Sequence, residues 1–421
     1  MDVNDPRLIQ ITRSIVLEGF EPQYDELDEP FPASALWSGV AGLGSELWLD
    51  TGDPEAIEGA WTREFSALTT NNTLLNREVQ KGTYDDLVRR SAGALRAELP
   101  DLHEADLVRE IAFILNAYHG LRLVERFDAH VSVEEHTDLA HDADAAVAYA
   151  RRYAEICPER FYVKIPLTAA GLVAARQCAR QEIPVNLTLG FSARQNVLVA
   201  LIARPRFCNV FLGRLNQVVS EAGLGDGRLV GERTTVASQQ AVSRLRRADE
   251  GLATRQIAAS MRSGEQVRDL AGIDVLTIPP KAAGEFVDMH PDPAALRSAV
   301  SADYRPQFAD DIDPGEWDLD GLWDVPDGLE DAARELASDE TLDADGLLGG
   351  LAEAGFGAVL PRWTEPDVAK ATSDGKIPAL ADWRHRLAAD EAGLDALMNL
   401  HGLRSFATDQ EAMDERVRRL L

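Results

Sequence analysis

The sequence has little cysteine and no long apolar run. Its three cysteines, Cys157, Cys178 and Cys208, are widely spaced and odd in number. This pattern argues against a disulfide framework or a zinc site and favours reduced thiols in a cytoplasm. No stretch approaches the roughly 20 apolar residues that cross a bilayer, and the acidic, polar start of the chain lacks a signal-peptide pattern. We therefore expect a cytoplasmic protein with no membrane partner.

Positive charge is scarce, and lysine especially so. The 421 residues include 42 Lys and Arg against 71 Asp and Glu, for a formal net charge of −29. Such a surface repels phosphate, so no nucleic-acid partner is expected, and any phosphate site needs concentrated Arg and backbone N–H groups. A high-salt cytoplasm would screen the dense carboxylates; a GC-rich genome is an equally good explanation. Only five of the cations are Lys: Lys81, Lys164, Lys281, Lys370 and Lys376.

Short apolar, β-prone runs alternate with helical patterns between residues 45 and 280. The runs expected to be strands are Glu46–Asp50, Ala67–Thr70, Phe127–Val133, Phe161–Ile165, Ile183–Leu189, Cys208–Leu212, Gln256–Ser260 and Asp274–Ile278. Helices are expected between them, as over Ala143–Glu155, Ala169–Gln181 and Ser192–Ala203. This alternation is typical of βαβ units, and eight repeats predict an α/β fold, a (β/α)₈ TIM barrel. A doubly wound sheet is the second interpretation.

Changes in composition divide the chain into segments. They are an N-terminal extension (1–45), the barrel (46–300), an acidic connector (301–345) and a helical C-terminal region (346–421). Turns are expected around Glu21–Ala33, and the Pro- and Gly-containing connector is expected to be solvated, with short helices. Near the end, helices are expected over Trp383–Asn399 and Asp409–Leu421. This region could cover the barrel mouth, form a subunit contact in a homo-oligomer, or brace the helices.

Lys164 is the most informative residue. It lies within the apolar run Phe161-Tyr162-Val163-Lys164-Ile165-Pro166, which otherwise suits a buried strand. A buried ammonium is costly, so the side chain should pair with a carboxylate or give up its proton. A neutral lysine amine is the nucleophile of Schiff-base chemistry, which Arg cannot supply. From position alone, a lysine that reaches solvent at a strand end is an equally good explanation.

Polar side chains follow several expected strands, where barrel active sites are built. They are Asp50, Asn71, Glu134, Asn186 and Thr188. Taken singly, each is more often a helix cap or a turn residue. Arg214, Ser260 and Arg262 lie beside expected helix starts and suggest a phosphate clamp.

A metal-dependent barrel hydrolase would need clustered histidines. His130, His136 and His141 form neither a His-x-His nor a His-Glu-x-x-His element, so no metal site is expected.

Five segments resemble the signature stretches of the transaldolase family, in the family's order and spacing. They are Leu49-Asp50-Thr51, Thr69-Thr70-Asn71, Val163-Lys164-Ile165-Pro166, Val185-Asn186-Leu187-Thr188-Leu189 with Phe191-Ser192, and Ala258-Ala259-Ser260-Met261-Arg262. The similarity covers about residues 45 to 285, and the segment from Asp374 on is similar to the tail of longer transaldolases. It implies class I Schiff-base chemistry without metal or organic cofactor. A dihydroxyacetone unit would pass between sugar phosphates of the pentose phosphate pathway.

The resemblance also implies a role for each matched residue. Lys164 would form the imine, and Asp50 would act as the general acid/base of carbon–carbon cleavage. Glu134 and Thr188 would hold the water that shuttles protons. The implied substrate ligands are Asn71 and Asn186 for the dihydroxyacetone hydroxyls, and Arg214, Ser260 and Arg262 for the phosphate.

One position departs from the family pattern, one leaves a choice of residue, and two indicate which branch of the family the chain resembles. Asn209 stands where a serine is common, and Glu135 competes with Glu134 for the water-positioning role, which we assign to Glu134 by register. Phe211, expected at the substrate, and Glu134 resemble transaldolases, whereas fructose-6-phosphate aldolases tend to have Tyr and Gln. A free aldolase is therefore the second interpretation. A non-catalytic sugar-phosphate-binding or scaffold protein is the third.

Overall fold

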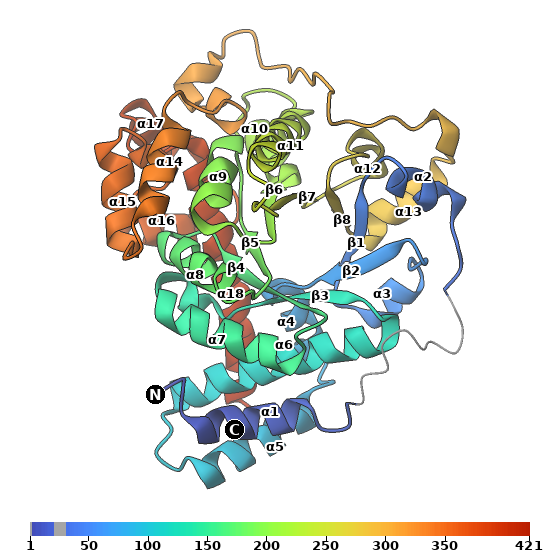
Figure 1. Ribbon diagram of the computed structural model, residues 1–421, viewed down its shortest axis with the longest axis vertical. Coiled ribbons are helices and arrows are strands. Elements are labelled where there is room, and N and C mark those ends of the chain that lie inside the picture. Colours follow the sequence, from blue (N-terminus) through green and yellow to red (C-terminus); the bar gives the residue numbers. More distant parts are fainter. Residues whose placement is uncertain (1, 21–30) are drawn as a thin grey trace.

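A closed barrel of parallel strands forms the centre of the molecule. The computed structural model describes residues 2–20 and 31–421, so most of the predicted turn-rich stretch Glu21–Ala33 lies outside the described residues. The strands neighbour one another in chain order around the barrel (Figure 1). They are β1 (Glu46–Asp50), β2 (Phe65–Thr69), β3 (His130–Glu134), β4 (Phe161–Pro166), β5 (Val185–Thr188), β6 (Phe207–Phe211), β7 (Arg255–Ala259) and β8 (Val275–Ile278). The predicted (β/α)₈ barrel is confirmed.

Helices connect the strands and surround the barrel. They are α3 (Pro54–Glu58), α4 (Asn72–Gln80), α5 (Asp85–Glu98), α6 (Glu104–Phe127), α7 (Ala143–Ile156), α8 (Ala169–Ala179), α9 (Ala193–Leu198), α10 (Leu212–Glu221), α11 (Val230–Ala248), α12 (Gly264–Asp269) and α13 (Pro280–Asp288). The helix expected over Ser192–Ala203 is α9 continued by a π-helical turn, Val199–Ala203.

The third expected strand, Phe127–Val133, is wrong at its start. Phe127 is the last residue of α6, and Asp128 ends that helix in the left-handed conformation (φ 46°). The strand therefore begins only at His130. Phe127 is apolar and lies only a few residues before the strand, so the sequence alone did not show that it belongs to the preceding helix.

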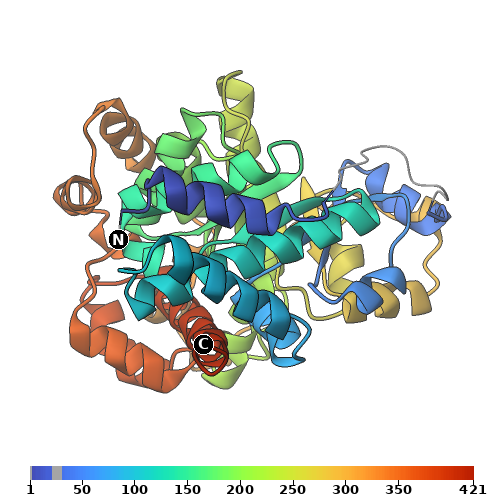
Figure 2. The same cartoon turned by 90° about the horizontal axis from the view of Figure 1, so that it is seen from below.

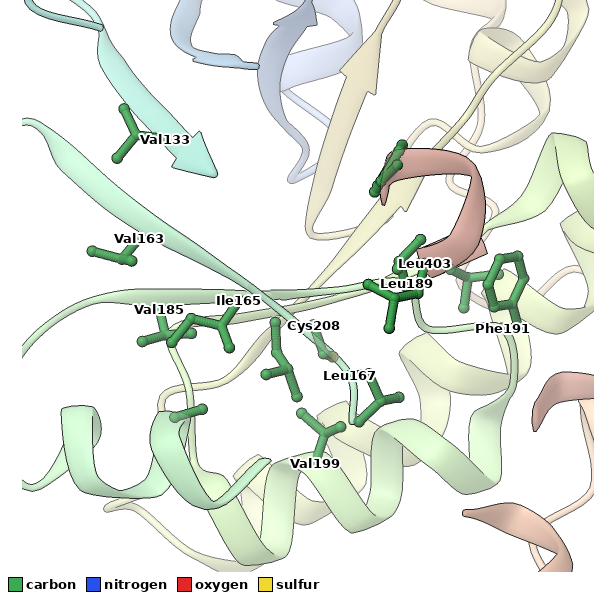
Figure 3. Packing of buried hydrophobic residues seen from close by; sticks show 14 of the residues in the cluster. Val133, Val163, Ile165, Leu167, Val185, Leu189, Phe191, Val199, Cys208 and Leu403 are labelled. Atoms are coloured by element: carbon green, nitrogen blue, oxygen red, sulfur yellow. The ribbon is translucent and has the colours of Figure 1, made fainter. Parts of the chain in front are cut away.

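Alternation along the strands divides the core into two parts. Outward side chains such as Val163, Ile165 and Val185 pack against the surrounding helices (Figure 3). Inward side chains form a separate apolar cluster in the lower barrel, where Trp48 stacks on Tyr162 with ring centroids 5.6 Å apart. Because side chains alternate with a period of two, the next inward residues on β1 and β4 are Asp50 and Lys164.

Two helices precede β1. They are α1 (Pro6–Val16) and α2 (Ala35–Ala41). Helix α1 packs against α5, α6 and α7 on the outside of the barrel (Figure 2). No helix among the described residues has both the length and the apolar character needed to cross a membrane.

Helices α14 to α18 follow the barrel. They are α14 (Leu329–Ser338), α15 (Ala344–Glu353), α16 (Glu365–Asp374), α17 (Leu380–Ala388) and α18 (Leu394–Arg418). The first four gather on one side of the barrel, beside α8 and α9, while α18 runs back across it (Figure 1). The preceding stretch contains short 3₁₀ helices at Pro314–Trp317 and Asp320–Leu322.

The two helices expected near the C-terminus are wrong in their limits. The helix expected over Trp383–Asn399 breaks after Ala388, where Asp390 adopts the left-handed conformation (φ 52°). A side chain at Gly393 would then meet the Arg194 guanidinium. The helix expected over Asp409–Leu421 is the second half of α18. Helix α18 includes Gly402, where a side chain would meet Leu189 of a neighbouring barrel loop.

Candidate active site

The candidate site lies inside the barrel, at the carboxyl ends of the strands. All ten residues predicted for the site lie at these ends or in the turns and helix starts that follow. Strand register sets neighbours side by side, since Glu134 of β3 pairs with Lys164 of β4, and Lys164 pairs with Asn186 of β5. The barrel thus brings together residues that are far apart in the sequence.

Lys164 is buried at this end of the barrel, with 4% of its surface exposed. Its Nζ donates a hydrogen bond to the Thr70 carbonyl oxygen (3.1 Å) and lies 3.4 Å from Glu134 Oε2. The Phe406 ring of α18 lies above it, with its centroid 5.7 Å from Nζ. The lysine therefore has a carboxylate partner within reach and almost no contact with solvent.

The side chains of Glu134 and Glu135 have different surroundings, because consecutive side chains of an extended strand point to opposite faces. Glu134 Oε2 accepts a hydrogen bond from the Asn72 N–H (3.2 Å), and burial raises the pKa of this carboxyl although Lys164 opposes the shift. Neither carboxyl oxygen of Glu135 has a hydrogen-bond partner among the described residues. Burial raises the pKa of Glu135 well above its ordinary value. Of the two carboxyls, only Glu134 lies at Lys164.

Asp50 lies at the end of β1, beside β2. Its Oδ1 accepts a hydrogen bond from the Thr69 hydroxyl (2.9 Å), which in turn bonds the Thr277 hydroxyl (2.6 Å). Burial raises the pKa of the Asp50 carboxyl, while Lys164 and then Thr69 and Arg262 lower it in part. A carboxyl held in this way takes up a proton more readily than an exposed aspartate does, which suits a general acid/base.

Amide and hydroxyl groups line the β3, β5 and β6 side of the site. Asn186 Nδ2 donates to the Ser132 hydroxyl (3.1 Å), and its Oδ1 accepts from Asn209 Nδ2 (3.3 Å). Asn209, which stands where the transaldolase family commonly has a serine, also bonds the Leu187 carbonyl (3.1 Å) and so braces β5 against β6. The buried Thr188 hydroxyl has no hydrogen-bond partner among residues 2–20 and 31–421. It is free to hold a water or a substrate hydroxyl.

Asn71 serves as a helix cap. Its Oδ1 accepts a hydrogen bond from the Leu74 N–H (2.9 Å) at the start of α4. Its amide nitrogen has no hydrogen-bond partner in the described part of the chain. The structural role expected for a residue of this kind therefore leaves the amide NH₂ group, with its two N–H donors, for a ligand.

Two arginines supply positive charge to the site. Arg214, in the first turn of α10, is buried, and its Nη1 has no hydrogen-bond partner among the described residues. Burial and then the neighbouring Arg262 lower the pKa of Arg214 to about 10. A side chain at Gly213 would meet the Ser260 carbonyl oxygen and the Arg262 side chain. Within residues 2–20 and 31–421 these two neighbouring cations share no carboxylate partner, which suits an anionic ligand.

Phe211 and Ser260 complete the set of predicted site residues. Phe211 ends β6, and its ring lies 5.7 Å from the Arg214 guanidinium carbon. Ser260 directly follows β7 and has a positive φ of 64°. The left-handed region is uncommon for serine and marks a constrained turn, which frequently occurs at functional sites.

Helix α18 covers part of the site, which is one of the three roles left open for the C-terminal region, although no residue of α18 was predicted to contribute to the site. The Phe406 ring lies 5.4 Å from the Arg214 guanidinium carbon as well as over Lys164. Thr73, in the helix after β2, hydrogen-bonds Asp409 of α18. The helical periodicity of this region was visible in the sequence, but nothing in it indicated which face meets the barrel.

The three histidines considered for a metal make separate contacts. His130 stacks on Tyr162 with ring centroids 4.9 Å apart. His136 Nε2 lies 3.1 Å from Asp414 Oδ2 of α18, and His141 borders a cavity outside the barrel. Across residues 2–20 and 31–421, no three His, Cys, Asp or Glu side chains are arranged to hold a metal ion.

Comparison with known proteins indicates which family the chain resembles. A family model described as transaldolase/fructose-6-phosphate aldolase matches residues 47–320, which include all the predicted site residues. A protein named transaldolase from Xanthomonas euvesicatoria pv. vesicatoria (strain 85-10) is 29% identical over 310 residues, covering 71% of this chain and 94% of the relative. Another protein of that name, from Prochlorococcus marinus (strain NATL2A), is 30% identical over 250 residues, covering 58% and 74%. The resemblance predicted from the five signature segments is thereby confirmed.

Proposed function

Because this chain belongs to the transaldolase/fructose-6-phosphate aldolase family, we propose that it is a transaldolase of the pentose phosphate pathway. It transfers a dihydroxyacetone unit from fructose 6-phosphate or sedoheptulose 7-phosphate to erythrose 4-phosphate or glyceraldehyde 3-phosphate. The observation that carries the proposal is the buried Lys164 amine, 3.4 Å from the Glu134 carboxyl. The relatives named transaldolase support it. The reducing environment expected from the three cysteines supports a cytoplasmic location.

The reaction begins with imine formation on Lys164. The neutral amine attacks C2 of the ketose phosphate and gives a carbinolamine, which loses water to leave a protonated imine. Glu134 donates the proton that departs with the hydroxyl as water and remains a carboxylate beside the protonated imine, and a water held by Glu134 and Thr188 carries a proton back to it when the imine is hydrolysed. The raised pKa of Glu134 supports this role, because burial makes this carboxyl hold its proton more firmly than an exposed glutamate does.

Carbon–carbon cleavage follows at Asp50. The carboxylate takes the proton of the C4 hydroxyl, the C3–C4 bond breaks, and the electron pair moves into the protonated imine to give an enamine. The shortened aldose phosphate then leaves. The enamine attacks the carbonyl carbon of the acceptor aldose phosphate, and Asp50 returns its proton to the new hydroxyl. Water finally hydrolyses the imine and frees Lys164.

The remaining residues bind and orient the substrate. Asn71 and Asn186 hold the hydroxyls of the dihydroxyacetone unit, which must stay bound between the two half-reactions. Arg214, Ser260 and Arg262 bind the phosphate, and Phe211 packs beside them. Two closely spaced cations without a shared carboxylate support this assignment in a chain whose net charge is −29.

Borohydride trapping tests the proposal. Reduction in the presence of fructose 6-phosphate should give a stable adduct of one dihydroxyacetone unit on Lys164, located by peptide mass spectrometry. Lys164→Arg should give no adduct, and Lys81→Arg, a lysine at the surface, should react as the wild type does. A folded wild-type protein without an adduct would overturn the proposal.

Product analysis separates a transferase from a free aldolase. With erythrose 4-phosphate present, a transaldolase gives sedoheptulose 7-phosphate, and little dihydroxyacetone appears. Free dihydroxyacetone at the same rate with and without the acceptor would indicate the aldolase instead. An intact fold that binds fructose 6-phosphate without trapping or turnover would indicate a non-catalytic binding protein.

A further inference from the structure

A large cavity lies outside the barrel, between the C-terminal helices and the start of α8. Its volume is about 830 Å³, within the range of small-molecule sites. Helices α15, α16 and α18 and the loop before α16 supply most of its wall, and Thr168 and Ala169 of the barrel close it. None of the residues assigned to the Schiff-base site lines it.

Most of the cavity wall is apolar. Leu348, Leu360, Trp363, Leu400 and Leu403 are among its lining residues. Leu360, Leu400 and Leu403 are buried beneath it, with 4–8% of their surfaces exposed. An apolar concave surface of this size favours a ligand with an aromatic or branched apolar body.

One end of the cavity is positive in an otherwise strongly acidic protein. His141 and Arg404 line this end and lie close enough that Arg404 contributes to lowering the pKa of His141, after burial. Arg404 Nε donates to the Thr372 hydroxyl (2.8 Å), and no carboxylate pairs with this guanidinium among the described residues. The start of α8, at Thr168 and Ala169, adds the positive end of a helix dipole. The positive charge of Arg404 and of the start of α8 suits an anionic group of a ligand.

Arg362 and Glu365 also line the cavity, and their charges do not cancel the positive charge at its Arg404 end. Arg362 is paired with Asp345 and is exposed. Glu365 lies in the first turn of α16, where the helix N-terminus stabilises its charge.

We propose that this cavity binds a small amphipathic anion, whose apolar body lies on Trp363, Leu400 and Leu403 and whose carboxylate or phosphate lies between Arg404 and the start of α8. The proposal is independent of the reaction at Lys164.

Binding there acts on the helix that covers the barrel. Asn399 lines the cavity, and its Nδ2 donates to the carbonyl oxygens of Leu167 (2.8 Å) and Leu189 (3.0 Å), just beyond β4 and β5. Leu403 lies beside Leu189 (Figure 3). Phe406, on an adjacent face of α18, lies over Lys164. A ligand in the cavity therefore stabilises α18 in its position over the site.

Fluorescence titration with 8-anilinonaphthalene-1-sulfonate, an aromatic anion, tests the proposal on the native full-length protein. We expect one saturable site, at least ten-fold tighter than for N-phenyl-1-naphthylamine, which has the same body without the charge. Ala369→Trp, at an exposed lining position, should fill the cavity and abolish binding. Arg404→Gln should weaken it about ten-fold. Equal affinity for the neutral dye, or unchanged binding by both variants, would overturn the proposal.

Two controls locate the dye. Arg418→Gln removes an exposed cation near the end of the same helix, and Arg262→Gln removes one from the barrel mouth. Both variants should bind the dye as the wild type does, and a loss in Arg262→Gln would move the dye to the barrel and overturn the proposal. 1-Naphthoate and 1-naphthyl phosphate then compete with the dye. Displacement by either supports the anion site and identifies its preferred head group; displacement by neither contradicts it.

Discussion

Asp50 combines a raised pKa with a position beside Lys164 at the barrel mouth. Asp50→Asn keeps an oxygen acceptor for the Thr69 hydroxyl but removes the base that drives cleavage. Transfer should therefore fall by roughly 10²–10⁴-fold, while borohydride still traps the imine of the intact ketose on Lys164. The measurement is the rate of sedoheptulose 7-phosphate formation, together with the mass of the trapped adduct.

Asp53→Asn is the matched control for this change. Asp53 caps α3 and pairs with Lys81 at the surface (3.1 Å), and asparagine also caps helices well. Its turnover should stay within two-fold of the wild type, about 0.4 kcal/mol. An Asp50→Asn variant with near-normal transfer would rule out the proposed base.

Glu135 is a buried carboxyl with no hydrogen-bond partner among the described residues. Its pKa is raised above the ordinary 4.5, chiefly by burial and then by Glu134, so the native state holds its proton more firmly than the unfolded state. Stability is therefore lost as pH rises from about 4.5 towards the folded pKa, by up to about 1.4 kcal/mol per pH unit. Glu135→Gln removes this loss, and its advantage in urea unfolding should grow from pH 4.5 to 8.

Exposed Glu159→Gln provides the comparison for Glu135→Gln. Its unfolding free energy should follow the wild type at every pH. If Glu135→Gln were no more stable than the wild type at pH 8, the carboxyl would have to be paired or hydrated in solution.

At the scale of elements, α18 lies over Lys164 at the barrel mouth. The Phe406 ring covers Lys164 and contacts Arg214, and exclusion of water protects a reactive enamine from hydrolysis. Phe406→Ala should therefore raise the ratio of free dihydroxyacetone to transferred product several-fold. Leu420→Ala, just beyond the same helix, is the control and should leave the ratio unchanged. An unchanged ratio in a folded Phe406→Ala protein would show that α18 does not shield the intermediate.

A buried ion cluster fixes the start of α18. Asp395 is fully buried and accepts hydrogen bonds from Arg194 (2.7 and 2.8 Å) and from the Ser192 hydroxyl (2.5 Å), next to β5. Asp395→Asn removes buried, charge-assisted hydrogen bonds but leaves Arg194 with Asp318 as a carboxylate partner, so we expect a loss of about 1–3 kcal/mol in unfolding free energy. Urea unfolding measures this loss.

The exposed pair Arg384–Glu316 supplies the reference for that loss. Arg384→Gln should cost at most about 1 kcal/mol, because solvent screens the pair. A cost for Asp395→Asn no larger than that for Arg384→Gln would contradict the anchoring role.

Across the whole molecule, the sequence predicted the barrel because its signals are local. Short apolar runs alternate with helical stretches along the chain, so the fold follows from local patterns, whereas position alone left the direction of the Lys164 side chain open. The break at Asp390 and the contact of Phe406 with Lys164 depend instead on residues more than 190 positions away, such as Arg194. Register along the strand had already favoured Glu134 over Glu135 from the sequence, and in the structure Glu134 pairs with Lys164.

The acidic surface makes a prediction about the whole chain. A net charge of −29 destabilises the compact state by self-repulsion, which salt screens over a Debye length of about 10 Å at 0.1 M and about 3 Å at 1 M. We expect the thermal midpoint to rise by several degrees between about 0.1 M and 1 M KCl, and most steeply at the low end. Sucrose at equal osmolality should not reproduce that low-end rise, because it carries no charge. A midpoint independent of KCl would favour a genomic origin of the composition over adaptation to salt.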